Sequence, residues 1–283
     1  MDKLKHPKVF VIVLNHNGKR TVSRCLTSIY RSDYQNFETI VVDNASRDGS
    51  IETVRQNFQT AHVIINQTNL GFAAGNNVAI RFALEKFADY VLLLNNDAYL
   101  EPTTLSALVL QAQKDKKVGM INPLILNSEG KTWFEGGKID WLKMKTFHLR
   151  PENEKNSDYL CGCALLISKE VFQKVGLFDE KFFLYYEDTD LSLRTKKAGF
   201  SLLVDRGTKI VHDEQSSSAG AQKIYWLVLS GILFFKKHMP SILKPWMYFY
   251  LMLRKLKNAR DLASGENEVA SAVRHAYNDA SKL

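Results

Sequence analysis

The sequence predicts an α/β fold in which a mostly parallel sheet carries helices on both faces, followed by a C-terminal helical appendage. Two observations support this prediction. Short β-rich runs alternate with amphipathic helical patterns through the first hundred residues, as expected for parallel strands joined by crossover helices. After about Ser216 the composition changes to a basic, aromatic-rich stretch. A chain of 283 residues is long enough for one large domain and an appendage.

The individual elements follow from apolar runs and from i, i+3, i+4 spacing. In the first half we expect strands over 9–14, 39–42, 62–65 and 90–94, with helices over 22–29 and 74–87 between them. In the second half, Pro102 opens a helix predicted over 102–115. The remaining predictions are a strand over 160–168, a helix over 188–198, and short strands over 201–204 and 209–211.

Polar residues follow each strand of the first half. They are Asn15, Asp43, Asn66 and the run Asn95-Asn96-Asp97. One Asn or Asp after a strand is commonly a turn or capping residue. Ligands of parallel α/β sheets bind beyond the carboxyl ends of the strands, so the repetition at four successive strands indicates a polar ligand site.

Several nucleotide and hydrolase motifs are absent. The first βα turn has no G-x-G-x-x-G, and the chain has no G-x-x-x-x-G-K-[ST], G-x-S-x-G or H-E-x-x-H. A nicotinamide enzyme and a P-loop NTPase are therefore disfavoured. A basic nucleic-acid binder is disfavoured too, because the aromatic residues form no RNP-like motif and acids crowd the predicted site.

A carboxylate at a strand end is suited to a divalent metal. Asp97 follows the buried run 90–94, where it could hold Mg²⁺ or Mn²⁺ bridged to substrate phosphates. His212 follows the apolar run 209–211 and is either a structural histidine or a further ligand. Imidazole as a ligand would favour Mn²⁺.

A second cluster spans residues 182–194, where four aromatic residues lead into three acids at a helix start. Asp190 and Arg194 are spaced i, i+4 and are expected to form a structural pair. Asp188 has no obvious partner. A helix N-terminus favours an ionised carboxylate, and the aromatic residues can exclude water, so Asp188 is the better candidate for a general base. Simple helix capping is the alternative.

Five stretches of the chain, taken together and in this order, resemble the family-2 glycosyltransferases with the GT-A fold. Among these, the pattern is most similar to the bacterial rhamnosyltransferase-type subgroup that builds surface polysaccharides. The stretches span roughly residues 8 to 215, and they are 13–17, 41–50, 69–77, 94–97 and 183–194.

The resemblance implies roles for matching positions. Asp188 would be the catalytic base, with Glu187 beside it, and Asp97 and His212 would be metal ligands. Asn95 stands where the family's Asp-x-Asp motif has its first acid. Gly162, Cys163 and Arg194 would bind the acceptor. The nucleotide would be bound by a larger set, in which Asp43 accepts a hydrogen bond from the base N3–H: Asn15, Asn17, Asp43, Asn44, Asn69, Gly71, Asn76 and Asn96.

The implied reaction is an inverting transfer that depends on Mn²⁺ or Mg²⁺. The donor would be dTDP-rhamnose or a UDP-hexose, and the acceptor a glycan or a polyprenyl-linked sugar. Residues 1–215 would form the catalytic domain, with a nucleotide-binding half over 1–100 and an acceptor-binding half over 101–215, and residues 216–283 would form the tail. The alternative function is a non-catalytic, membrane-associated scaffold that retains the fold.

The tail carries unopposed positive charge. Between Ala221 and Arg260 there are eight basic residues and no Asp or Glu. Because such an aromatic-rich stretch suits an anionic membrane surface, we expect a peripheral protein on the inner face of the cell membrane. The alternative is a helical pair packed on the main domain, with its lysines solvated. Three cysteines, Cys25, Cys161 and Cys163, cannot all pair, which favours a reducing cytoplasm.

Overall fold

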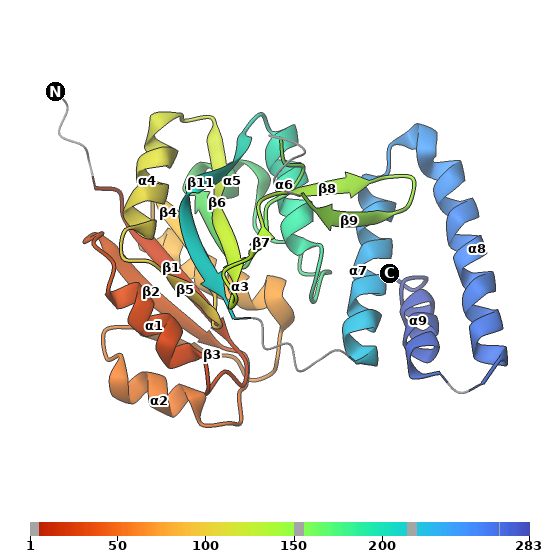
Figure 1. Ribbon diagram of the computed structural model, residues 1–283, viewed down its shortest axis with the longest axis horizontal. Coiled ribbons are helices and arrows are strands. Elements are labelled where there is room, and N and C mark those ends of the chain that lie inside the picture. Colours follow the sequence, from red (N-terminus) through yellow and green to blue (C-terminus); the bar gives the residue numbers. More distant parts are fainter. Residues whose placement is uncertain (1–5, 150–155, 214–219, 266) are drawn as a thin grey trace.

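The computed structural model describes residues 6–149, 156–213, 220–265 and 267–283. It consists of a nine-stranded mixed sheet with helices on both faces, and of three further helices beside it (Figure 1). The strand order is β3-β2-β1-β4-β10-β6-β11-β5, with β7 paired to β6. The boundary expected between residues 215 and 216 lies outside the described residues.

The first half is a parallel βα unit, as the sequence predicts. β1 pairs in parallel with β2 and β4, and β2 with β3, so their carboxyl ends lie at one edge. The elements are β1 (Val9–Asn15), α1 (Val22–Tyr30), β2 (Phe37–Asp43), α2 (Ser50–Asn57), β3 (His62–Ile65), α3 (Gly71–Glu85) and β4 (Tyr90–Asn95).

The second half makes the sheet mixed. β10 lies antiparallel between β4 and β6, and β11 pairs in parallel with β6 and antiparallel with β5. The elements are β5 (Ala98–Leu100), α4 (Thr104–Lys114), β6 (Val118–Asn127), β7 (Thr132–Phe134), β8 (Gly137–Asp140), β9 (Lys145–His148), β10 (Ala164–Ser168), α5 (Lys169–Val175), α6 (Glu187–Lys197) and β11 (Ser201–His212).

Two sequence predictions are wrong in this half. The short strands expected over 201–204 and 209–211 are one strand, β11, whose register shifts between Asp205 and Lys209. The strand expected over 160–168 begins only at Ala164. The Asn122 side chain donates to the Cys161 carbonyl at 2.9 Å and accepts from its N–H at 2.8 Å. These bonds hold residues 161–163 in a turn that precedes β10.

The sheet separates two apolar layers. Alternate residues of β1 point to opposite faces, so Val11 belongs to the apolar layer that contains α1, α2 and α4, whereas Ile12 belongs to the layer that contains α3, α5 and α6. Because both faces of β1 and β4 are covered, these strands read as continuous apolar runs rather than alternating ones.

The C-terminal part consists of α7 (Ala221–His238), the 3₁₀ turn η1 (Ser241–Leu243), α8 (Lys244–Ala263) and α9 (Glu268–Asp279). α9 packs on α7 through a small apolar cluster that includes Ile232 and Tyr277. The β8–β9 hairpin reaches from the sheet toward these helices (Figure 1), and Trp246 Nε1 donates to the Leu142 carbonyl at 2.9 Å. Among the described residues, no helix combines the length and the apolar character needed to cross a bilayer.

Candidate active site

The polar residues at the strand ends lie together, as expected from the sequence. β1 and β2 end side by side, so Asn15 is paired in register with Asp43. The Asn15 amide donates to Asp43 Oδ1 at 3.0 Å and to Ser50 Oγ at 2.8 Å, and Asn15 Oδ1 accepts from Asn96 Nδ2 at 3.0 Å. Asp43 Oδ2 accepts from the Ser46 N–H at 3.0 Å. This buried network fixes the loops that follow three neighbouring strands.

A second part of the network joins the β2 loop to α3. Asn44 donates to the Gly71 carbonyl at 2.9 Å and to Asn69 Oδ1 at 3.2 Å. Asn76 donates to the Phe72 carbonyl within its own helix. Gly71 has φ +77°, and a Cβ there would lie 2.3 Å from the Phe183 carbonyl, so only glycine permits this approach. This approach lets the Phe72 N–H donate to the Phe183 carbonyl at 2.7 Å, which holds the loop that carries the predicted base.

The predicted nucleotide residues divide into two groups. Asn17 and Asn96 line an open cavity of about 510 Å³, together with Lys19, Arg20 and Asp97. The others lie behind this surface and support its loops: Asn15, Asp43, Asn44, Asn69, Gly71 and Asn76. The sequence did not single out Lys19 or Arg20, because isolated basic residues after a strand carry no motif.

A second cavity, of about 450 Å³, brings the predicted metal and catalytic residues together. Asp97, His212, Glu187, Asp188, Gly162 and Cys163 all line it, and Asp97 also lines the first cavity. Several further lining residues were not identified as site residues from the sequence, among them Trp133, Thr146, His148, Tyr159, Lys223 and Leu227. Lys223 and Leu227 belong to α7, so the tail contributes to this cavity.

Asp97 and His212 are brought together by strand pairing. His212, at the end of β11, is paired with Ala98 of β5, the residue that follows Asp97. His212 Nε2 lies 3.2 Å from Asp97 Oδ1. The two atoms are at ion-pair distance but do not form a hydrogen bond, because Asp97 Oδ1 is buried without a hydrogen-bond partner. His212 Nδ1, the other ring nitrogen, is also buried without one. The Trp133 ring packs edge-on against the His212 ring at 4.7 Å and limits its rotation.

This pair fits a hard divalent cation that is completed by substrate. Asp97 Oδ1 is buried without a hydrogen-bond partner, and His212 Nε2 lies 3.2 Å from it, so a carboxylate oxygen and an imidazole nitrogen suited to Mn²⁺ lie side by side. Within the described ranges no group of three or more His, Cys, Asp or Glu side chains is arranged to hold a metal. Mg²⁺ and Mn²⁺ commonly use one or two protein ligands, substrate phosphates and water, so the two residues are sufficient.

Asp188 is held at the start of α6 by an unusual turn. Tyr185 and Tyr186 have φ of 68° and 67°, a left-handed conformation that costs about 1–2 kcal/mol per residue. Asp188 Oδ2 accepts from the Gly162 N–H at 3.0 Å, and its Oδ1 accepts from the Thr189 N–H at 2.6 Å. Asp188 therefore has partners that the sequence did not reveal, and they aim its carboxylate into the cavity.

The two acids at this turn are differentiated by their surroundings. Burial raises the pKa of Asp188, although its hydrogen bonds from Gly162 and Thr189 oppose the shift. Burial and the adjacent Asp188 raise the pKa of Glu187 well above its usual range, and Glu187 Oε2 has no hydrogen-bond partner. The helix start was expected to keep Asp188 ionised by lowering its pKa. Desolvation outweighs that effect, which brings Asp188 closer to the pKa of an efficient base.

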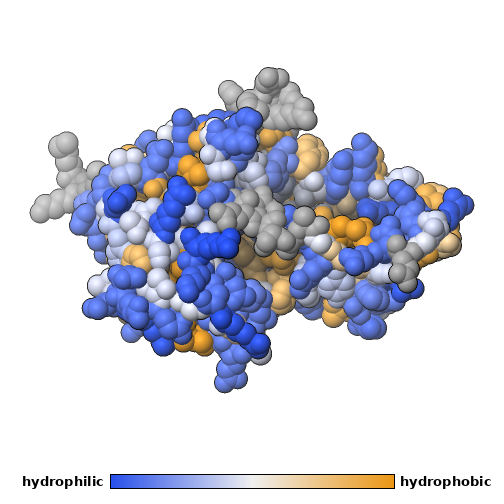
Figure 2. All heavy atoms as spheres, turned by 60° about the horizontal axis from the view of Figure 1, so that its bottom comes forward, coloured by the Kyte–Doolittle hydropathy of each residue, from blue (hydrophilic) through white to orange (hydrophobic). Residues whose placement is uncertain are grey.

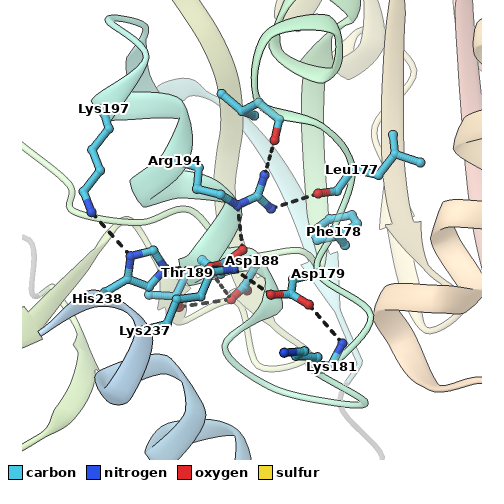
Figure 3. Close-up of polar contacts among 12 residues, drawn as sticks. Leu177, Phe178, Asp179, Lys181, Asp188, Thr189, Arg194, Lys197, Lys237 and His238 are labelled. Carbon is cyan, nitrogen blue, oxygen red and sulfur yellow. Dashed lines mark hydrogen bonds and ion pairs between the residues drawn. The ribbon is translucent and has the colours of Figure 1, made fainter.

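Asp190, two residues further along α6, joins this helix to α7. It is fully buried and contacts Arg194 Nε at 2.7 Å, Lys237 Nζ at 2.7 Å and His238 Nε2 at 2.6 Å. Desolvation raises the pKa of Asp190, but the hydrogen bond with His238, the charge of Arg194 and the hydrogen bond with Lys237 outweigh it and lower the pKa to about 2. Figure 3 shows Arg194 reaching toward Leu177, while Lys237 and His238 approach from α7.

The assignment of Arg194 to the acceptor is corrected by this geometry. Its guanidinium donates to Asp190 and to the carbonyls of Val175 and Leu177, at 2.7 and 2.9 Å for the two carbonyls. It does not line the cavity that contains Asp188. The i, i+4 pair with Asp190, expected from the spacing, is confirmed.

Comparisons with known proteins identify the family of this chain. The family model described as "Glycosyl transferase family 2" matches residues 10–176. An N-acetylglucosaminyl-diphospho-decaprenol L-rhamnosyltransferase of Mycobacterium tuberculosis is 23% identical over 235 residues, 74% of this chain and 76% of that protein. A dTDP-rhamnosyl transferase, RfbF, of Shigella flexneri is 22% identical over 249 residues, 83% of this chain and 82% of that protein.

Solved structures share the α/β fold. A structure of GalNAc-T7 with UDP, GalNAc and Mn²⁺ matches 96% of this chain with a TM-score of 0.71 and 17% identity, and this chain spans about half of it, 54%. A mannosyltransferase from Pyrobaculum calidifontis, in complex with GDP-Man and Mn²⁺, has a TM-score of 0.62 and 18% identity, over 98% of this chain and 81% of that chain.

The Asp190 contacts lead to a stability prediction. Asp190→Asn should lower the free energy of unfolding by about 3–5 kcal/mol, because it leaves the mostly buried Arg194 and His238 side chains without their carboxylate partner. Chemical denaturation at pH 7 measures this change. Glu129→Gln, which breaks an exposed pair with Lys131, is the control and should cost below about 1 kcal/mol. Equal effects of the two substitutions would contradict the structural role of Asp190.

The same carboxylate gives a pH dependence. The pKa of Asp190 is lower in the folded state than its ordinary value of 3.8. Its contribution is therefore fully present above that value and is lost as the pH falls toward about 2.

Proposed function

Because the chain belongs to glycosyl transferase family 2, we propose that it moves a sugar from a nucleoside diphosphate donor to an acceptor hydroxyl in polysaccharide biosynthesis. One observation carries the mechanism: Asp188 lines the same cavity as the Asp97–His212 pair. A proton acceptor and a place for the diphosphate thus face one reaction space.

The proposed chemistry is a single inverting displacement. Asp188 accepts the proton of the acceptor hydroxyl while the hydroxyl oxygen bonds to the anomeric carbon, and the bond from that carbon to the diphosphate oxygen breaks. Glu187, which retains its own proton more readily, orients the acceptor. Asp97 and His212 would hold Mn²⁺ or Mg²⁺, which when bound supplies positive charge to the departing nucleoside diphosphate.

The nucleotide is proposed to bind over the strand-end network of residues 1–100. Asp43 would accept from the base N3–H, and Asn17 and Asn96 would contact the nucleotide from the open cavity. Each carboxylate oxygen of Asp43 already accepts one bond and keeps further lone-pair capacity. The rhamnosyltransferase relatives favour dTDP-rhamnose, and UDP-hexoses are the second choice.

The acceptor is proposed to enter from the side of residues 101–215. Gly162 and Cys163 line the cavity beside Asp188, and the Gly162 N–H fixes the base itself. A Cβ at position 162 would lie 2.9 Å from the Phe72 ring, so a side chain there would displace the wall of this cavity. The relative from Mycobacterium is named for a diphospho-decaprenol acceptor, and a glycan or polyprenyl-linked sugar is proposed here.

We also propose that α8 binds the cytoplasmic face of the cell membrane. Trp246, Tyr248, Phe249, Met252, Leu253 and Leu256 are 40–61% exposed on this helix. Five of the eight basic residues expected in the tail lie on α8, whereas Lys237 pairs with Asp179 and Asp190 on the main domain. The alternative of a tail packed on the domain therefore suits α7, whereas α8 has the exposed apolar and basic composition of an interfacial helix.

Asp188→Asn should lower turnover by about 10²–10⁴-fold while donor binding survives, because the substitution removes the proton acceptor and keeps the shape. Donor hydrolysis, in which water replaces the acceptor, measures turnover, and calorimetry measures binding. Glu187→Gln should cause a smaller loss. If Glu187→Gln abolishes turnover while Asp188→Asn keeps it, Glu187 rather than Asp188 is the base. If the wild-type protein hydrolyses no donor, the result favours a non-catalytic scaffold.

Chelation of divalent metal should abolish donor hydrolysis, and Mn²⁺ or Mg²⁺ should restore it. Asp97→Ala should resist this rescue, because the buried oxygen that faces His212 is lost. Thr103→Ala, at a surface position outside both cavities, should be rescued as the wild type is. Full activity in excess chelator would mean that side chains such as Lys19 and Arg20 hold the diphosphate instead.

The protein should float with liposomes that contain anionic lipid. Each basic residue near an anionic surface contributes about 1 kcal/mol, a contribution that salt weakens. A variant with Lys255 and Lys257 changed to Glu should float less, whereas Lys116→Glu, outside the tail, should not. Equal flotation with neutral vesicles, or none with either, would contradict membrane binding through α8.

A further inference from the structure

A further cavity adjoins the active site on the side of the C-terminal helices. It has a volume of about 330 Å³ and lies between the β8–β9 hairpin and helices α7, α8 and α9. It shares Thr146, Tyr186 and Leu227 with the cavity that contains Asp188. Since Tyr186 immediately precedes the Glu187-Asp188 pair, this linker cavity begins next to the proposed base.

The lining of the linker cavity differs in chemistry from that of the active site. Its wall contains Val228, Ile232, Phe235 and Leu251, together with Lys145 and Arg254, and none of the described residues that line it is an acid. Arg254 lies over the Tyr250 ring at 5.9 Å, and across the described ranges no carboxylate forms an ion pair with it. The active-site cavity, by contrast, contains Asp97, Glu187 and Asp188. The described lining of the linker cavity therefore offers positive charge without a carboxylate, which suits a second anionic group next to the base.

Another cavity continues in the same direction. It has a volume of about 320 Å³ and shares Ile232, Leu251 and Tyr277 with the linker cavity. Its remaining wall includes Tyr248 and Met252, which are 61% and 48% exposed, and the cations Lys236 and Lys255. This outer cavity therefore leads from the linker cavity to the exposed apolar side chains of α8. Figure 2 shows hydrophobic residues on this helical part and at its junction with the α/β domain.

We propose that the linker and outer cavities bind an anionic lipid carrier of the acceptor, an inference that rests on the proposed glycosyl transfer. The phosphate groups of the carrier lie by Lys145 and Arg254, and its hydrocarbon chain runs along Ile232 and Leu251 toward α8. The sugar at the other end then reaches Asp188. A free glycan would use neither the apolar wall nor the cations, so the lining favours an amphipathic acceptor with a charged linker.

Binding of farnesyl diphosphate, a soluble probe with a diphosphate and a hydrocarbon chain, tests the proposal by calorimetry. The full-length protein is used with and without saturating uridine diphosphate and Mn²⁺, so that occupancy of the donor site is controlled. We expect farnesyl diphosphate to bind at least about tenfold more tightly than inorganic pyrophosphate, because the chain buries apolar surface. We also expect it to bind more tightly than dihexanoylphosphatidylglycerol, which represents a membrane phospholipid.

Arg254→Gln should weaken farnesyl diphosphate binding about tenfold, and Lys145→Gln should weaken it in the same direction. Lys257→Gln is the matched control, since it removes a cation from the same helix but lines neither cavity. Thermal unfolding of each variant verifies that the fold is kept. No binding of the probe, equal binding of pyrophosphate or of the phospholipid, or equal losses at positions 254 and 257 would overturn the proposal.

The proposed function has a separate readout in the same experiment. Nucleoside diphosphate and Mn²⁺ are titrated against each variant, and Arg254→Gln should leave their affinity unchanged because Arg254 lies outside the donor cavity. If no nucleoside diphosphate binds the wild type, the proposed glycosyl transfer fails. If nucleotide binds and Arg254→Gln leaves the probe unaffected, only the lipid-carrier assignment fails.

Discussion

The buried carboxylate of Asp190 is the constraint on which the active site depends. Asp190 lies two residues after Asp188 in α6, and its contacts with Lys237 and His238 attach α7 to α6. With α7 in place, Ser230 donates to the Leu184 carbonyl at 2.7 Å, and Tyr186 packs against Phe234. These contacts support the two left-handed residues before Glu187, whose conformation a free loop would not keep. The base is thus positioned by a helix that follows the sheet in sequence.

A second consequence concerns charge. Three acids line the active-site cavity, and the groups around each acid determine its role. Asp97 Oδ1 faces His212 without a hydrogen-bond partner, Asp188 accepts hydrogen bonds from backbone N–H groups, and burial raises the pKa of Glu187 well above its usual range. Three acids within one cavity therefore have three environments, suited to a cation, a proton acceptor and a neutral hydrogen-bonding group.

Much of this arrangement could be predicted from the sequence, and the family and the GT-A fold predicted there are confirmed. Strand ends are marked by local chemistry, so Asp97 and His212 could be identified before their pairing through β5 and β11 was known. The contribution of Lys223 and Leu227 to the active-site cavity could not be predicted. An apolar and basic helix has the same sequence pattern whether it lies on a membrane or covers a cavity. Likewise, the pKa of Asp188 depends on its burial and on the hydrogen bond from the distant Gly162 N–H, which no spacing in the sequence reveals.

We propose that α7 unfolds together with α6, because Lys237 and His238 of α7 contact the buried Asp190 of α6. Hydrogen–deuterium exchange of the wild-type protein tests it directly, since amides exchange at rates set by the local free energy of opening. Peptides from α7 over 229–236 should be protected as strongly as peptides from the start of α6, and both should lose protection together in mild denaturant. Rapid exchange of α7 while α6 remains protected would contradict the account.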